Sequence, residues 1–143
     1  MGKGQVFAPM EWVKKEFAKL NRNLTTATRG TSTWNTSDTN FAPSKSTIFV
    51  DKIDGIPLAS ITCKAYISVL SANTTMHIAT TSIKPRSALK FPMTVVAGTT
   101  IYNDSTATLE IATDGKIYVK SSAGVSSGSP RVFELVGETY FTQ

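Results

Sequence analysis

Residues 61–69 alternate between apolar and polar side chains, and this two-residue period constrains the fold more than any other feature of the chain. The apolar positions are Ile61, Cys63, Ala65, Ile67 and Val69, and the polar positions are Thr62, Lys64, Tyr66 and Ser68. Side chains of an extended strand point alternately to its two faces. The segment is therefore predicted to be a long strand with one buried face and one polar face.

Short segments of the same character fill the rest of the chain from residue 47 onward. The expected strands are Thr47–Ile53, Thr75–Ser82, Leu89–Val96, Thr99–Asn103, Thr106–Ala112, Lys116–Ser121, Arg131–Val136 and Glu138–Thr142. No helical pattern alternates with them, which favours antiparallel over parallel pairing. The expected fold is mainly β: an antiparallel β-sandwich or jelly-roll-like head over residues 47–143, with a short N-terminal α-helix.

The Asp114-Gly115 turn allows the register of one hairpin to be predicted. A two-residue loop would place Ile111 opposite Tyr118. A three-residue loop of residues 113–115 places Ile111 opposite Ile117. This register gathers four aliphatic side chains on one face and leaves Glu110, Tyr118 and Lys120 on the other, so it is the one expected. The same register places Gly115 in the left-handed region, where a side chain is costly.

The N-terminal segment, residues 1–26, carries the only helical signal. Its apolar positions Met10, Val13, Phe17, Leu20 and Leu24 follow one another at alternating spacings of 3 and 4. Such a short helix must pack on something to be stable. The partner is either the body of the same subunit or the same helix in neighbouring subunits, and the narrow stripe favours the second, an oligomerisation and attachment segment. Residues 27–46 are rich in Ser, Thr and Asn and are expected to form a polar linker.

The net charge of +5 is concentrated in residues 1–30, which carry +4 of it. A body of nearly balanced charge does not favour a nucleic-acid partner. The sequence shows neither a signal peptide nor an apolar run long enough to span a bilayer, so we expect synthesis in a cytoplasm and no membrane insertion.

Few residues are suited to catalysis or to metal binding. Cys63 and His77 are the only residues of their types, so neither a disulfide nor a transition-metal site is expected within one subunit. His77 lies on the polar side of an alternating strand, which favours a surface or interface role over that of a catalytic base. Asp51, Asp54 and Asp104 are explained by turns, as is Asp114. We expect no enzyme, no catalytic residue, no metal and no cofactor.

Exposed aromatic residues beside polar ones are typical of saccharide binding, because sugar C–H faces stack on rings. Tyr66, Tyr102, Tyr118 and Trp34 meet this description, and burial between subunits is the alternative for Tyr66 and Tyr118. The candidate ligand-binding residues are expected in loops at one end of the sandwich or in the cleft between adjacent subunits; they are Arg86, Tyr102, Asn103, Asp104 and Arg131. Each of them also fits a plain structural role as a turn or surface residue.

Two segments of the chain, with Gly98 between them, are similar to a known protein family. They are Ser82-Ile83-Lys84-Pro85-Arg86-Ser87-Ala88-Leu89-Lys90-Phe91-Pro92 and Ala107-Thr108-Leu109-Glu110-Ile111-Ala112-Thr113-Asp114-Gly115-Lys116-Ile117-Tyr118-Val119. They resemble the head domains of bacteriophage tail-fibre, baseplate and receptor-binding proteins over about residues 56–121. The resemblance implies a β-sandwich head that forms a homotrimer, with an N-terminal segment attached to other virion structural proteins.

Two functions are consistent with these observations. The first is a virion-associated tail or baseplate protein whose trimeric head recognises a host cell-surface saccharide. The second is a purely structural virion component, such as a decoration or connector protein, which binds no receptor. In both cases the protein is expected in the virion after synthesis in the host cytoplasm.

Overall fold

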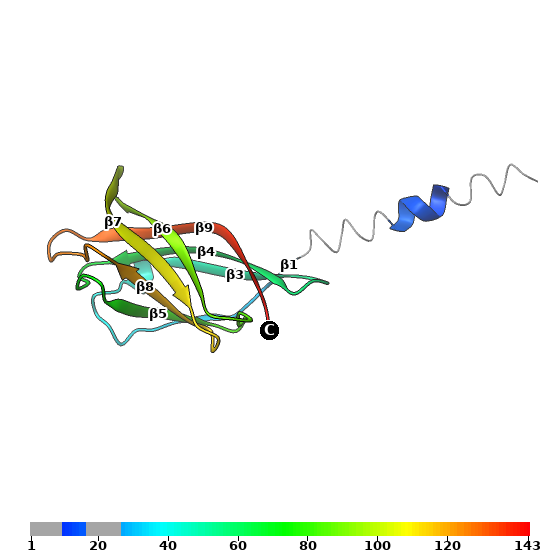
Figure 1. Ribbon diagram of the computed structural model, residues 1–143, viewed down its shortest axis with the longest axis horizontal. Helices are drawn as coiled ribbons and strands as arrows, with labels where there is room; N and C mark the ends of the chain where they lie inside the picture. Colours follow the sequence, from blue (N-terminus) through cyan, green and yellow to red (C-terminus); the bar gives the residue numbers. More distant parts are fainter. Residues whose placement is uncertain (1–9, 17–26) are drawn as a thin grey trace, which may run out of the picture.

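A computed structural model describes residues 10–16 and 27–143, apart from the side chains of Asp104 and Ser105 (Figure 1). Residues 10–16 form a short α-helix, and Pro43–Lys45 form a single 3-10 turn, η1. The strands are β1 (Ala27–Arg29), β2 (Ser32–Trp34), β3 (Thr47–Ile53), β4 (Leu58–Ile67), β5 (Thr75–Thr81), β6 (Leu89–Ala97), β7 (Thr100–Ile111), β8 (Lys116–Ser121) and β9 (Arg131–Phe141).

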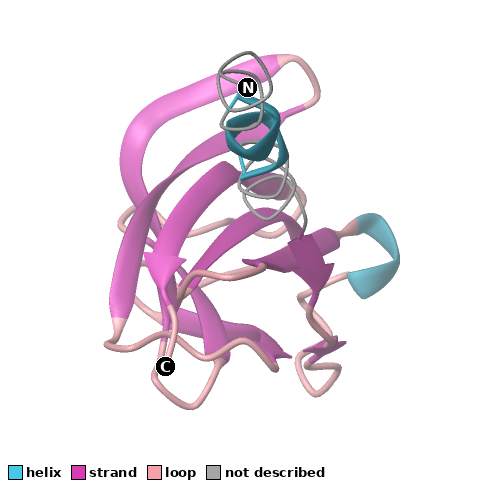
Figure 2. Cartoon of the chain, turned by 90° about the vertical axis from the view of Figure 1, so that its right-hand side faces the viewer, coloured by secondary structure: helices cyan, strands magenta, loops and turns pink. Residues whose placement is uncertain are grey.

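The nine strands form one antiparallel sheet in the order β1-β3-β4-β9-β6-β7-β8-β5-β2. The sheet curls around the core, as Figure 2 shows, and gives a β-sandwich-like architecture. This confirms the expected fold class. The bounds of β3 and β8 are those predicted, while two expected pairs of strands are each a single long strand, β7 and β9.

The strand β7 is continuous where the sequence suggested a turn at residues 103–105. Its pairing with β6 moves from Met93–Ala107 to Val95–Tyr102, so Thr94 alone faces residues 103–106. The extra residues are therefore absorbed by a bulge within the ladder, which bends the strand without ending it. In β9 a smaller bulge lies at Gly137, which has a φ of 64° and whose N–H bonds the Thr62 hydroxyl at 3.1 Å.

The hairpin between β7 and β8 has the predicted register. Ile111 pairs with Ile117 and Leu109 with Val119, and all four side chains are buried. The N–H of Ala112 donates to the carbonyl of Lys116 at 2.9 Å, which closes a three-residue loop. Gly115 has a φ of 91°, as this loop requires.

Residues 27–46, expected from the sequence to be a polar linker, instead contribute two short strands to the sheet. Within this segment β1 pairs with β3 and β2 pairs with β5, so consecutive residues join the two edges of the curled sheet. At the crossing the Gly30 N–H donates to the Val50 carbonyl, and the carbonyl of Thr31 accepts from Ser82, both at 2.8 Å. A Cβ at Gly30 would lie 2.6 Å from Cδ1 of Ile83, so the crossing chain packs closely on the body.

The core consists of the inward-facing side chains of alternate strand positions. Its largest fully buried members include Phe133, Ile61, Ile67, Ile78, Leu109, Ile111, Ile117, Val50 and Val119. Residues 27–46, which we call the crossing segment, add two rings to this core: Phe41 is buried, and Trp34 packs against the core. The strands therefore hold the inner face by apolar packing, and their outer faces remain available for polar contacts.

Candidate functional site: a groove across β6, β7 and β8

The structure brings together two of the five ligand-binding residues expected from the sequence. The Arg131 guanidinium carbon lies 3.8 Å from the centroid of the Tyr102 ring. A second contact holds the guanidinium, because it donates to the carbonyl of Ser129 at 2.8 Å. Asn103 is exposed in the β7 bulge, and the backbone of Asp104 lies in the same bulge.

Arg86 lies in a different part of the structure from Tyr102 and Arg131. Its N–H donates to the Phe141 carbonyl at 2.8 Å, and its guanidinium lies 5.3 Å from the Phe141 ring centroid. Arg131 and Phe141 are the two ends of β9, which separates them by about 30 Å at the rise of an extended strand. Arg86 therefore does not share a site with Tyr102 and Arg131 within one chain.

The position of Tyr102 limits its use for stacking. The ring is partly buried and packs against the core, and the guanidinium of Arg131 lies over it. A cation over the ring face is a favourable contact in its own right. A sugar that stacked on Tyr102 would have to displace Arg131, so this pair is a poor preformed platform.

A better candidate lies on the outer face of β6, β7 and β8. One cross-strand row places Lys90 beside Glu110 and Glu110 beside Tyr118. The next row places Thr108 beside Lys120. Directly opposite side chains on one face of an antiparallel sheet have Cβ atoms about 5 Å apart, so these residues form one continuous polar surface.

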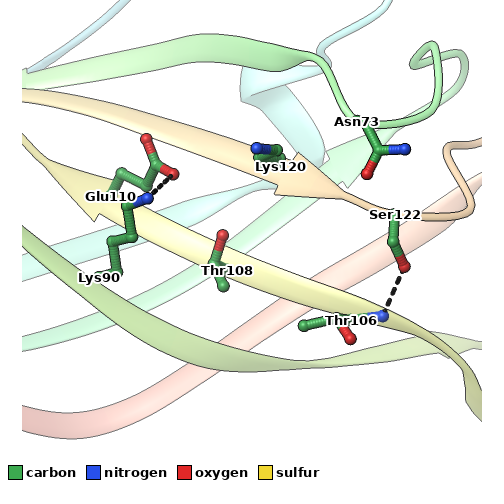
Figure 3. Close-up of a pocket in the computed structure, with 7 residues that line it drawn as sticks. All are labelled: Asn73, Lys90, Thr106, Thr108, Glu110, Lys120 and Ser122. Carbon is green, nitrogen blue, oxygen red and sulfur yellow. Dashed lines mark hydrogen bonds and ion pairs between the residues drawn. The ribbon is translucent and has the colours of Figure 1, made fainter.

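Two hollows adjoin on this surface and share Lys90 and Glu110; we call them together the groove. The larger hollow, about 240 Å³, is lined by Asn73, Lys90, Thr106, Thr108, Glu110, Lys120 and Ser122 (Figure 3). The smaller one, about 140 Å³, is lined by Ala88, Leu89, Lys90, Glu110, Ile111, Ala112 and Tyr118. Hydroxyl, amide and ammonium groups thus line one half, while aliphatic groups and a tyrosine line the other.

Contacts between residues that line the groove fix the positions of their side chains. The Lys90 ammonium lies 3.5 Å from the Glu110 carboxylate, between the two hollows. At the far end of the larger hollow, the Ser122 hydroxyl accepts the N–H of Thr106 at 2.8 Å (Figure 3). Asn73 reaches this end from a left-handed turn with φ of 59°, a conformation that asparagine tolerates.

His77 of β5 is the cross-strand neighbour of Tyr118, with the two ring centroids 5.2 Å apart. Its Nε2 lies 3.0 Å from the carbonyl oxygen of Ala79, and its Nδ1 lies 3.2 Å from the Asn35 amide nitrogen. Because a carbonyl oxygen only accepts, we assign the proton to Nε2 and the acceptor role to Nδ1. His77 thus orders the Asn35 segment and supports Tyr118, and neither nitrogen is free to act as a base.

Two findings concern the other chemically reactive side chains of the described residues. Cys63 is buried, and burial raises the pKa of its thiol to about 12, which suppresses the nucleophilic thiolate. Within residues 10–16 and 27–143, no three His, Cys, Asp or Glu side chains are grouped to hold a metal ion. No helix in this part of the chain is long and apolar enough to cross a membrane.

Some of the residues that line the groove could be predicted from the sequence to share one face of the sheet. The predicted hairpin register already placed Glu110, Tyr118 and Lys120 on the polar face of β7 and β8. Lys90 and Asn73 were missed, because they reach this face through the β6–β7 pairing and a turn before β5. Neither of these long-range contacts follows from local periodicity.

Comparison with known proteins gave no relative: the chain matches no family model, no curated protein and no solved structure.

Proposed function

We propose that this protein is a saccharide-binding head and that the groove across β6, β7 and β8 is its binding surface. The observation that carries the proposal is the division of the groove into an apolar half with Tyr118 and a polar half with Thr108 and Lys120. Sugars have both kinds of surface, since their C–H faces are apolar and their hydroxyls need donors and acceptors.

The shape of the groove favours part of a polymer over an enclosed small molecule. Each hollow is smaller than the roughly 300–1,000 Å³ of pockets that enclose drug-sized ligands. Together they form a shallow path along three strands, with hydroxyls and ammonium groups along its course. A surface polysaccharide offers repeated units to such a path, and each unit contributes a weak contact.

The proposal includes assembly into a homotrimer on a virion, as the resemblance to phage receptor-binding heads implies. Its support in the chain is the N-terminal helix, where Met10 is 56% and Trp12 64% exposed. Val13 of the stripe lies in the same described helix, and Phe17, Leu20 and Leu24 lie outside the described residues. Three copies of a weak site give avidity that a single contact lacks.

Binding to arrayed bacterial surface glycans tests the proposal. The intact protein is expected to bind at least one surface polysaccharide, and Tyr118→Ala is expected to lose that binding while it keeps the native fold. Tyr102→Ala and Arg86→Ala serve as controls outside the groove and are expected to bind like the parent. Loss of binding in Tyr102→Ala alone would move the site to the Tyr102–Arg131 pair.

A structural virion component is the second candidate function, and a specific observation favours it. Phe49, Val136 and Phe141 are 41%, 79% and 59% exposed, all on strands β3 and β9. Exposed large apolar side chains on one part of a surface are typical of protein contacts. If no polysaccharide binds and Phe141→Ser releases the protein from its particle, this function is supported and saccharide recognition is not.

A further inference from the structure

Lys120 is the one cation of the groove that lacks a counter-charge among the described residues. It lies on β8 between Thr108 of β7 and Thr75 of β5 and is half-buried. Within the described part of the chain, neither an ion pair nor a hydrogen bond engages its ammonium group. An ammonium group that no carboxylate balances attracts an anionic group of a ligand, so this position favours a ligand that carries one.

The neighbouring lysines differ from Lys120 in this respect. Lys90 lies 3.5 Å from the Glu110 carboxylate, and Lys116 lies 4.0 Å from that of Asp114. The charge of Glu110 is thus already balanced by Lys90, and the groove keeps one net positive charge at Lys120. This charge lies in the middle of the larger hollow, between the Lys90–Glu110 pair and the Asn73–Ser122 end (Figure 3).

We infer that the saccharide bound in the groove carries an anionic group, a carboxylate or a phosphate, which pairs with Lys120. The inference rests on the proposed function and adds the chemical class of the ligand. An ammonium–anion hydrogen bond is about twice as strong as a neutral one. The hydroxyls of Thr108 and Ser122 and the amide of Asn73 line the same hollow and are placed to bind the sugar hydroxyls beside the charge.

The charge distribution favours an acidic saccharide over a nucleic acid. Nucleic-acid binding draws on several lysines and arginines that neutralise successive phosphates. The groove instead offers one unpaired ammonium among hydroxyl groups, and the Glu110 carboxylate, paired with Lys90, lies between its two hollows. One isolated anionic substituent for each few sugar units fits this arrangement better than a continuous row of phosphates.

Three probes and two matched variants test the inference in the intact protein by calorimetry. The probes are polygalacturonate oligosaccharides, glycerol-phosphate oligomers and neutral maltooligosaccharides of similar length. Lys120→Gln removes the charge in the groove. Lys52→Gln removes an exposed charge on β3, outside the groove, and controls for the net charge of the protein.

At least one acidic probe is expected to bind about tenfold more tightly than the neutral probe, with an affinity that falls as salt is added. Lys120→Gln is expected to remove this preference and to leave neutral binding unchanged, while Lys52→Gln stays within about twofold of the parent. The acidic probe that binds distinguishes carboxylate from phosphate.

Three results would overturn the inference. Equal binding of acidic and neutral probes, unchanged in Lys120→Gln, would contradict the charge preference and leave saccharide binding standing. Equal losses in Lys120→Gln and Lys52→Gln would show a general effect of net charge. An oligonucleotide that binds as tightly as the best acidic saccharide would show that the groove selects charge alone. Failure to bind any saccharide would instead contradict the proposed function itself.

Discussion

The rings of Trp34 and Phe41 lie 5.3 Å apart, with 54° between their planes, where the segment between β2 and η1 covers the core. Phe41 is only 3% exposed and also forms an isolated bridge with Ile67 of β4. Tilted aromatic pairs at this separation are favourable beyond the area that they bury. The segment is therefore part of the packed body.

Phe41→Ala is expected to lower the free energy of unfolding by about 3–5 kcal/mol, because it leaves a cavity that the surrounding chain only partly fills. Phe49→Ala is the matched control, since Phe49 is 41% exposed and the Arg29 guanidinium lies over its ring, 4.1 Å from the centroid. Phe49→Ala is expected to lower the free energy of unfolding by about 1 kcal/mol or less. Urea unfolding followed by circular dichroism measures both. Equal costs would show that residues 27–46 do not stabilise the body.

Glycine at position 115 is required for two separate reasons. Its φ of 91° strains any other residue, and a Cβ would also clash with the carbonyl oxygen of Thr81. Gly98 has a φ of 60°, but a Cβ there would meet no atom within 4 Å, so Gly98→Ala isolates the backbone strain. We expect Gly98→Ala to lower the free energy of unfolding by about 1–2 kcal/mol, and Gly115→Ala to lower it by about 1–3 kcal/mol more than that. Thermal unfolding that ranks the two variants equally would contradict this.

Alkaline pH is expected to destabilise the protein in a way that depends on Cys63. Burial raises the pKa of its thiol from 9.0 to about 12 in the folded chain. Between these values the unfolded thiol loses its proton and the folded one keeps it, so stability is fully present below pH 9 and falls as the pH rises. The slope from this group is at most about 1.4 kcal/mol per pH unit.

Urea unfolding of the parent and of Cys63→Ala between pH 8 and pH 11 measures this contribution. The variant is expected to be less stable at pH 8, because it leaves a small cavity, and to lose less stability above pH 9. Burial also raises the pKa of Tyr140 to about 12, so some alkaline loss persists in the variant. Parallel curves for the two proteins would contradict the role of Cys63.

Assembly is expected to depend on the apolar stripe of the N-terminal segment. Light scattering should give close to three times the chain mass of 15.4 kDa. Val13→Asp combined with Phe17→Asp should weaken assembly, because it would bury charges without partners. Lys15→Asp is the control, since Lys15 is exposed and lies outside the stripe. A monodisperse monomer of the parent at micromolar concentration would contradict the proposed trimer.

Local sequence patterns predicted the parts of the fold that depend on neighbouring residues. The two-residue period located β4, and the Asp114-Gly115 turn set the register of Ile111 and Ile117. The pairing of Ser32 with Thr81 joins residues 49 positions apart and leaves no local period, so the sequence of the crossing segment predicts a linker instead. In that segment the contacts with the hydrophobic core come from two rings, those of Trp34 and Phe41.

The groove was predicted only in part for the same reason. Alternation placed Tyr118 and Lys120 on a polar face, but their significance depends on Lys90 and Asn73, which other pairings bring beside them. Two of the candidate residues, Arg86 and Arg131, lie near opposite ends of the long strand β9 and are not brought together within one chain. Two short strands were expected in place of β9, so the distance between the two arginines could not be predicted.

Calorimetric titration of the polysaccharide that the parent binds most tightly, with Tyr118→Ala and Tyr66→Ala compared, tests the central claim most directly. Tyr118 lines the groove, whereas Tyr66 lies on β4 beneath the Lys45 ammonium, 4.7 Å from its ring. The account predicts at least a tenfold loss of affinity in Tyr118→Ala, about what the loss of a stacking contact costs, and less than about twofold in Tyr66→Ala, with both variants folded and assembled. Binding by Tyr118→Ala that equals the parent's would contradict a saccharide site in this groove.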